Sequence, residues 1–184
     1  ANAKAIDDTL EILDFRNMGK ALDKLKKANN IALFAQGGAT PVATDFYHGL
    51  INLGIQCIWQ PDSNMQLISS EFMGKGDVCI AISRSGEIKD VVDATKIARK
   101  GGAYCIGITA VPNSPLDRAA DLTMYTSVQN QVFRNIDNSH RVALLTILDS
   151  LYIGLASEDH QRTKEALILS TKATSSKRIV EDEY

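Results

Sequence analysis

The sequence has no apolar run near the roughly 20 residues that span a bilayer, and its first residues lack the basic-then-apolar layout of a signal peptide. It also lacks an excess of basic residues, since 20 Lys and Arg stand against 22 Asp and Glu and the net charge is -2. That balance argues against a chain that binds nucleic acid on its own, which would need a basic face. We therefore expect a cytoplasmic protein that makes no membrane contact.

Cysteine is scarce as well. The three thiols, Cys57, Cys79 and Cys105, are odd in number and no two have CxxC spacing, so neither a disulfide framework nor a zinc site is predicted. Each lies in a short apolar run, where a thiol behaves as a small hydrophobic side chain. We expect three reduced core residues, and neither a metal nor a cofactor.

The 184 residues have an ordinary globular composition, 45% hydrophobic and 23% charged, which suits one domain with a sizeable core. Short apolar runs without alternation are typical of strands buried on both faces, and helices between them supply the crossovers that parallel strands need. Such runs occupy residues 31–35, 56–59, 78–82, 104–108 and 122–125. The pattern predicts an α/β fold, a three-layer open sheet of about five parallel strands flanked by helices.

Helical spacing of apolar residues predicts one or two opening helices over 8–28, with a break near 17–19, and later helices that end near 53, span 88–99 and span 142–155. Thr40-Pro41 and Ser114-Pro115 each place a hydroxyl N-cap before a proline at the first helical position. After residue 157 we expect a surface helix over 158–169 and then a frayed tail.

Two loops follow strands of the predicted sheet, at the edge where open parallel sheets bind ligands. Residues 36–40 read Gln-Gly-Gly-Ala-Thr, and their glycines allow close backbone approach beside a helix N-terminus. Residues 83–87 read Ser-Arg-Ser-Gly-Glu, a compact set of donors that matches the oxygens of a phosphate. For each loop the alternative is a capped turn without a ligand.

These motifs carry a resemblance to a known family. The second loop after its buried strand, the first glycine turn and the later Asn113-Ser114-Pro115-Leu116 together resemble the sugar isomerase (SIS) domain, a phosphosugar-binding α/β fold with flavodoxin-like strand order. The resemblance spans residues 18–155. Residues 139–151 further resemble the SIS domain of RpiR-type bacterial transcriptional regulators, in which an N-terminal helix-turn-helix domain binds DNA and the SIS domain senses a phosphosugar.

The resemblance implies that residues 1–156 form the SIS domain and 157–184 a C-terminal helix and tail. DNA would then be bound only through a helix-turn-helix domain, which we expect to be absent from this chain. Ser83 and Ser85 are implied to hold the phosphate, with help from backbone N–H groups around Gly86 and Glu87 and from Thr40. The implied sugar phosphate site, which includes no catalytic residue, comprises Gly38, Thr40, Ser83, Arg84, Ser85, Gly86, Glu87 and His140.

Three positions depart from the family pattern. Gln36 stands where the family usually has glycine, Thr40 where it has serine, and Ile88 where it often has threonine. The change at residue 40 keeps the hydroxyl. The change at residue 88 removes one phosphate donor.

The resemblance leaves a sensor and a phosphosugar isomerase as alternatives. In isomerases of the family the general base is commonly a glutamate in the segment between the last strand and the long helix. This chain has no glutamate between Glu87 and Glu158. His140 or Asp137 could replace it. We therefore expect binding without turnover. The apolar helix over 142–155 and the opening helix are expected to expose more apolar surface than one sheet face can cover. The resemblance also implies pairing, because SIS domains usually pair, so we expect a homodimer with the sugar site near the interface. A nucleotide-binding domain is the third alternative, and the lack of GxGxxG spacing and of a P-loop lysine disfavours it.

Other polar and aromatic residues are assigned simpler roles. His48 and Phe133 are interpreted as packing residues, and His160 as part of a solvated helix start, since no second histidine follows it at metal-binding spacing. Arg134 and Arg141 flank the gap before the long helix, where either a phosphate or a surface salt bridge would suit them.

Overall fold

The computed structural model describes residues 2–127 and 139–177. Its centre is one sheet of five parallel strands in the order β2-β1-β3-β4-β5, which is the flavodoxin-like order. The strands are β1 (Ile31–Ala35), β2 (Cys57–Ile58), β3 (Val78–Ile82), β4 (Tyr104–Thr109) and β5 (Leu122–Tyr125). The predicted strands are confirmed, although β2 at the edge is shorter than its apolar run.

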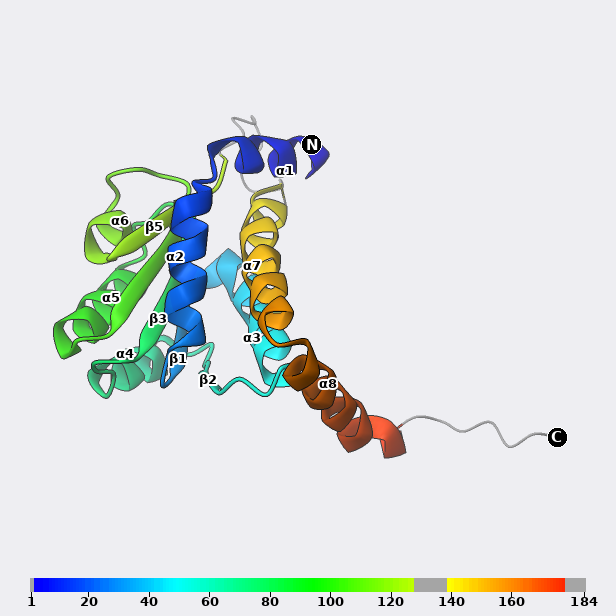
Figure 1. The fold of residues 1–184 in the computed structure, drawn as a ribbon. Helices are drawn as coiled ribbons and strands as arrows, with labels where there is room; N and C mark the ends of the chain where they lie inside the picture. Colours follow the sequence, from blue (N-terminus) through cyan, green and yellow to red (C-terminus); the bar gives the residue numbers. More distant parts are fainter. Residues whose placement is uncertain (1, 128–138, 178–184) are drawn as a thin grey trace.

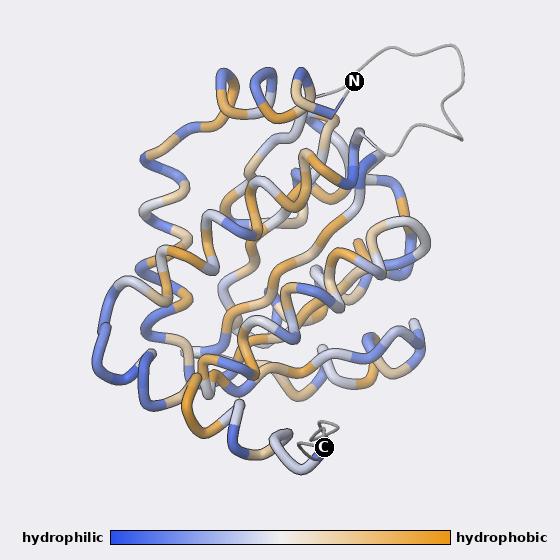
Figure 2. Tube along the Cα trace, turned by 90° about the vertical axis from the view of Figure 1, so that its right-hand side faces the viewer, coloured by the Kyte–Doolittle hydropathy of each residue, from blue (hydrophilic) through white to orange (hydrophobic). Residues whose placement is uncertain are grey.

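Helices cover both faces of the sheet (Figure 1), because alternate strand residues point to opposite sides. In β1, Ile31 and Leu33 face a core shared with α2 (Phe15–Lys26), α3 (Thr40–Asn52) and α7 (Ser139–Glu158). Ala32 and Phe34 face a second core under α5 (Lys89–Gly101) and α6 (Pro115–Ala119), the face on which α4 (Ser63–Glu71) also lies. Figure 2 shows apolar segments gathered along the strands and the inner sides of the helices. The predicted three-layer architecture is confirmed.

Two helix boundaries differ from the predictions. The break between the opening helices lies at residues 13–14, not 17–19: α1 (Asn2–Ile12) is separated from α2 by the N-cap Asp14, whose carboxylate accepts the N–H groups of Arg16 and Asn17. Helix α7 extends beyond 142–155 at both ends. Its length is explained by three neighbours, α1, α2 and α3, which pack against it.

Helix α4 was not predicted at all. It begins after the N-cap Asp62, which accepts the N–H of Met65, and the residues it buries are polar, Gln66 and Ser70. A helix whose buried positions are polar gives no apolar periodicity, which is why the sequence pattern missed it.

At the C-terminal side, α8 (His160–Thr174) and a short 3-10 turn (Ser175–Lys177) extend away from the body of the domain. Helix α8 buries none of its residues. The predicted surface helix is thus confirmed and is longer than expected. Among the helices that the structure describes, none is long and apolar enough to cross a membrane.

All three cysteines are free thiols. Cys79 and Cys105 are fully buried register partners on β3 and β4, and the hydrogen bond between their thiols, together with burial, raises the pKa of Cys79 well above its ordinary value. Cys57 is only partly buried, so it corrects the expectation of a core residue, although burial raises the pKa of its thiol to about 12.

Candidate functional site

The two glycine-containing loops begin side by side. Ala35, the last residue of β1, is the register partner of Ile82, the last residue of β3, and neighbouring strands lie about 4.8 Å apart. Gln36 and Ser83 therefore start the two loops from adjacent points on the carboxyl edge of the sheet, the upper edge in Figure 1. The sheet topology brings together the loops that the sequence singled out.

The second loop is a turn braced by its own serines. Gly86 has a positive φ of 67°, and its N–H donates to the carbonyl oxygen of Ser83 at 3.0 Å and to Ser83 Oγ at 3.1 Å. The N–H of Glu87 donates to Ser85 Oγ at 3.3 Å. Ser83 is buried and Ser85 half-buried, and each hydroxyl that accepts an N–H still carries a proton to donate.

The loop between β4 and α6 supports this turn from the side. A Cβ on Gly86 would lie 2.1 Å from Ser114 Oγ, so glycine is required both by space and by φ. The Gly86 carbonyl accepts the N–H of Leu116 at 2.9 Å. The Arg84 carbonyl accepts the N–H of Ala110 at 2.9 Å and Thr109 Oγ1 at 3.2 Å.

Thr109 and Ser114 are therefore positioning residues that the sequence analysis did not assign to the site. Ser114 was correctly predicted as an N-cap, and it accepts the N–H of Asp117 at 3.3 Å. Its contact with Gly86 follows from the pairing of β3 with β4, because loops that leave neighbouring parallel strands meet at the same edge.

The first loop corrects one prediction. Residues Gly37–Ala39 form a 3-10 turn, and Ala39, not Thr40, is the N-cap of α3, without a side-chain bond. Thr40 is the first helical residue and half-exposed. The 3-10 turn continues directly into α3, so Thr40 already has helical backbone geometry and cannot act as the N-cap.

Two sets of polar contacts, one buried and one partly buried, hold the first loop in place. Gln66 of α4 accepts the N–H of Ala35 and donates to the Ala35 carbonyl, both at 3.0 Å, at the point where β1 ends. Trp59 Nε1 donates to Thr44 Oγ1 at 3.1 Å, and that hydroxyl donates to the Thr40 carbonyl at 2.9 Å. The missed helix α4 thus positions the loop.

His140 comes to the first loop from the start of α7. Its Nε2 lies 3.5 Å from the point that a Cβ on Gly38 would occupy. Ser139 before it is buried, and Nε of Arg141 after it is a buried atom without a hydrogen-bond partner. Phe133, Arg134 and Asp137 lie outside the described residues.

The charged residues of the second loop point outward. The side chains of Arg84 and Glu87 are exposed. Ile88, the N-cap of α5, makes no side-chain cap bond and is 41% exposed. The first turns of α3 and α5 present N–H groups without intrahelical acceptors and the positive ends of two helix dipoles to the same edge. Backbone dipoles, the hydroxyls of the second loop and Arg84 at the rim are thus the groups at this edge that suit an anion.

The remaining histidines lie away from this edge. His48 is exposed on α3, with its ring centroid 6.0 Å from that of Tyr47. His160 is exposed at the first residue of α8. No group of three His, Cys, Asp or Glu side chains in the described part of the chain is placed to hold a metal ion.

The sequence model of the SIS domain matches residues 24–154. The chain belongs to the SIS domain family. The matched stretch contains both loops and His140, and it leaves α1 and α8 outside.

Among curated proteins, the SIS chain is 32% identical over 178 residues to an uncharacterized HTH-type transcriptional regulator of Caldanaerobacter subterraneus subsp. tengcongensis. The match covers 97% of this chain and 63% of the relative, so the chain spans about two thirds of that protein's length.

Two solved structures have the same fold. The NanR protein of Vibrio vulnificus, complexed with ManNAc-6P, superposes with a TM-score of 0.90 at 19% identity, covering 97% of this chain and 67% of NanR. The sugar isomerase domain of the RpiR transcription factor from Sphaerobacter thermophilus gives 0.85 at 20% identity, covering 93% of this chain and 94% of that one. At these identities the likeness concerns the SIS fold.

Proposed function

We propose that this SIS domain is the ligand-sensing part of a transcriptional regulator and that it binds a sugar phosphate without converting it. The regulator relative supports the first half, because its additional third could hold the helix-turn-helix domain that contacts DNA. The NanR complex with ManNAc-6P supports the second half. Such a regulator would act in the cytoplasm, and DNA would be reached only through the other domain.

The observation that carries the proposal is the pairing of the two loops at one sheet edge. Ala35 and Ile82 end their strands in register, and each loop leads into the N-terminus of a helix. A phosphate there would meet the hydroxyls of Ser83 and Ser85 on one side and the 3-10 turn at Gly38 on the other, with Thr40 beyond it. Helix N-termini and hydroxyl donors suit the oxygens of a phosphate.

Lack of turnover is supported by the sequence of the ligand-facing segments. No glutamate occurs from residue 88 to residue 157, so the carboxylate that isomerases of this family use has no counterpart there. The alternative, a phosphosugar isomerase, is favoured by one observation: His140 lies against the first loop, where an imidazole could exchange a proton with a bound sugar.

The test is to titrate the purified chain with a panel of sugar phosphates in a calorimeter and to follow each by proton NMR in D2O. The panel is fructose-6-phosphate, arabinose-5-phosphate, and the 6-phosphates of N-acetylglucosamine, N-acetylmannosamine and N-acetylmuramic acid. Binding without deuterium uptake at C1 or C2 and without etherase products supports the sensor. Deuterium uptake that His140→Ala abolishes would establish the isomerase instead, and no binding by any member would contradict both.

We also propose that the chain forms a homodimer with the sugar site near the interface. Helix α7 buries most of its apolar residues under α1, α2 and α3, but Ile153 on it is 61% exposed. Further exposed apolar side chains lie on the first two helices and on α8, namely Leu10, Ile12, Phe15, Leu167, Ile168 and Leu169. Light scattering that gives about one chain mass, 20.0 kDa, at micromolar concentration would refute the dimer.

A further inference from the structure

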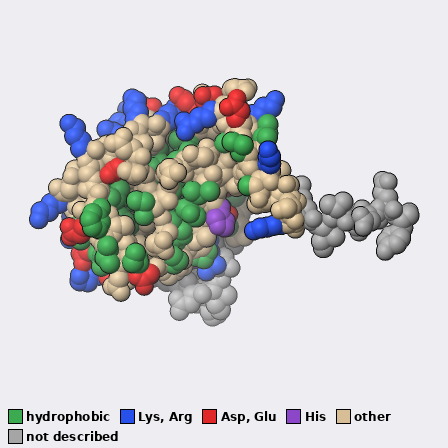
Figure 3. All heavy atoms as spheres, turned by 90° about the horizontal axis from the view of Figure 1, so that it is seen from below, with side chains coloured by type: hydrophobic (Ala, Val, Ile, Leu, Met, Phe, Trp, Pro, Cys, Tyr) green, Lys and Arg blue, Asp and Glu red, His purple; other side chains and the backbone are tan. Residues whose placement is uncertain are grey.

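The amino edge of the sheet, opposite the two loops, carries a basic cavity. A hollow of about 570 Å³ lies where α2, the α4–β3 loop, α5 and the start of β4 converge. Its cationic lining is Lys24, Lys27, Lys75 and Arg99, against two carboxylates, Asp77 and Asp121. Figure 3 looks onto this side of the molecule and shows Lys and Arg side chains along its upper and left margins, with Asp and Glu side chains among them.

A second hollow of about 350 Å³ shares Arg99 with the first. It adds three cations, Lys96, Lys100 and Arg118, and no acidic residue. Together the two linings hold seven basic and two acidic side chains, in a chain whose net charge is -2. The linings of the two hollows are therefore basic, although the chain as a whole carries a slight excess of acidic residues.

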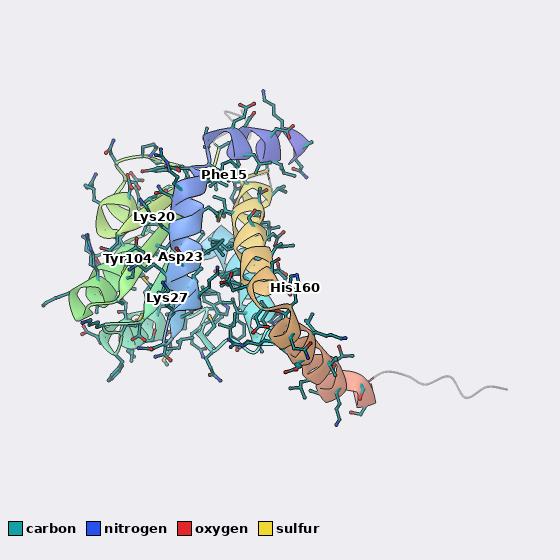
Figure 4. All side chains as sticks on the ribbon, in the orientation of Figure 1. Phe15, Lys20, Asp23, Lys27, Tyr104 and His160 are labelled. Carbon is teal, nitrogen blue, oxygen red and sulfur yellow. The ribbon has the colours of Figure 1, made fainter. Side chains whose placement is uncertain are left out.

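Two of the cations in the larger hollow are held in position. Lys24 Nζ lies 4.5 Å from the centre of the Tyr104 ring, within the range of a cation–π contact. Arg99 Nε pairs with Asp121 Oδ1 at 2.8 Å, and its Nη1 donates to the carbonyls of Arg118 and Ala119 at 3.4 Å. Figure 4 shows Tyr104 beside α2, level with Asp23 and between Lys20 and Lys27.

The carboxylates of the hollow already have partners. Asp77 accepts from Asn30 Nδ2 and from the N–H of Gly74, both at 2.9 Å. Asp121 accepts the N–H of Cys105 at 2.8 Å in addition to Arg99. Within the described chain, Lys24, Lys27 and Lys75 have no carboxylate within ion-pair distance. Three ammonium groups of this hollow are thus free of a direct ion pair, against one unpaired carboxylate charge, that of Asp77.

Helix dipoles explain only part of this arrangement. Arg99 and Lys100 end α5, and Lys24 lies in the last turn of α2, where cations are stabilised by the negative end of a helix. Lys75, however, belongs to the loop before β3, and it faces the same hollow. Convergence of cations from separate elements on one concavity indicates a ligand with several negative charges.

We propose that the hollow lined by Lys24, Lys27, Lys75 and Arg99 binds a compact polyanion, a chain of two or three phosphate groups. The Tyr104 face is already covered by Lys24, so a phosphate chain, and not a stacked base, is the part recognised. The neutral hydroxyl of Tyr104 can add a hydrogen bond as donor. The site is separate from the sugar phosphate loops, since the two lie at opposite edges of the sheet.

The experiment is a calorimetric titration of the full chain with inorganic tripolyphosphate at 150 mM NaCl. It is run on the unmodified chain and on the Ser83→Ala/Ser85→Ala variant, which removes hydroxyls from the other edge. Saturable binding that persists in this variant is expected. Lys24→Gln/Lys75→Gln should weaken binding at least ~10-fold, because charge-assisted contacts to phosphate are lost. The matched control, Lys164→Gln/Lys172→Gln on the projecting α8, removes the same charge and should change the affinity less than ~2-fold.

Several outcomes overturn the proposal. Absence of saturable binding at this salt concentration is one, and an equal loss in the α8 control is another, since it would indicate diffuse charge attraction only. A 20-base-pair duplex that binds as tightly and is lost in the same variant would make the edge a nucleic-acid face instead. Circular dichroism confirms that each variant folds. Because the sugar phosphates are titrated in a separate experiment, failure of that proposal is distinguished from failure of this one.

Discussion

The two edges of the sheet that we propose as anion sites present different kinds of donor. At the carboxyl edge the donors are hydroxyls and N–H groups, with Ser83 buried and Gly86 pressed against Ser114. At the amino edge the donors are long cationic side chains around Tyr104. The helices place their N-termini at the first edge and their C-termini at the second, so dipoles favour an anion at one and cations of the protein at the other.

This difference matters for specificity. Dipoles and hydroxyls held by the backbone recognise the shape of a phosphate and lose little affinity in salt, whereas exposed lysines recognise charge and are screened. The carboxyl edge is thus suited to one particular ligand, and the amino edge to a class of ligands. In a variant that changes one edge, ligand binding measured at the other edge can therefore serve as the internal control.

The largest effect is expected for Gly86→Ala. The new Cβ would lie 2.1 Å from Ser114 Oγ at a φ of +67°, so backbone strain and overpacking should lower the free energy of unfolding by about 2 to 5 kcal/mol. Sugar phosphate binding should be lost, while tripolyphosphate binding at the amino edge remains. Urea unfolding and calorimetry measure the two effects.

Gly19→Ala is the matched control for that change. Gly19 lies inside α2 and a Cβ there would meet nothing within 4 Å, so alanine should stabilise the chain by roughly 0.5 to 1 kcal/mol. Equal unfolding curves for Gly86→Ala and the unmodified chain would contradict a tight turn in which Gly86 packs against Ser114.

Replacing both loop serines by alanine is the next largest change. Ser83→Ala/Ser85→Ala removes several charge-assisted hydrogen bonds, each worth roughly 1.5 to 3 kcal/mol, and should weaken sugar phosphate binding at least ~100-fold. The control, Ser170→Ala/Ser175→Ala, removes two hydroxyls at the end of the molecule formed by α8 and should leave the affinity unchanged. Unchanged calorimetric affinity in the loop variant would refute the assignment of the site.

The sheet was predictable because its strands are buried on both faces. Residues 31–35, 78–82 and 104–108 are continuous apolar runs. In a chain with helices between such runs, that pattern is typical of a buried parallel sheet. Helix α4 was not predictable in the same way, because its buried positions are Gln66 and Ser70. The break at Asp14 was missed because the apolar spacing continues through Leu13 and obscures the N-cap.

The candidate site was predictable as two loops but not as an assembly. Glycines and serines after strands identify residues 36–40 and 83–87, and the strand order then places them together. The contacts of Gly86 with Ser114 and of His140 with Gly38 join residues 28 and 102 positions apart, and no local pattern encodes such pairs. Only the register of β3 with β4 and the packing of α7 on α3 create them.

Ile88→Thr should strengthen the carboxyl edge by a smaller amount. Ile88 is the N-cap of α5 and makes no side-chain bond, so a hydroxyl there should cap the helix and raise the free energy of unfolding by about 1 kcal/mol. If the hydroxyl also reaches the phosphate, sugar phosphate affinity should rise up to ~10-fold. Ile88→Val keeps the branched shape without the hydroxyl. A Thr variant no more stable than the Val variant would contradict the capping argument.

The smallest effect concerns pH and Asp117, which supports the Ser114 turn. Its carboxylate accepts the N–H of Asn113 at 2.6 Å and the Tyr125 hydroxyl at 2.9 Å. Burial alone would raise the pKa of Asp117, but hydrogen bonds from Thr123, Asn113 and Tyr125 outweigh it and lower that pKa.

A folded pKa below the unfolded value of about 3.9 stabilises the chain above that pH, and the contribution is lost as pH falls through the folded pKa. In urea unfolding from pH 7 to pH 3, the stability difference between the unmodified chain and Asp117→Asn should therefore shrink below about pH 4. The effect is small because the carboxyl is only half-buried, and a difference that stays constant down to pH 3 would show that the carboxylate does not hold the turn.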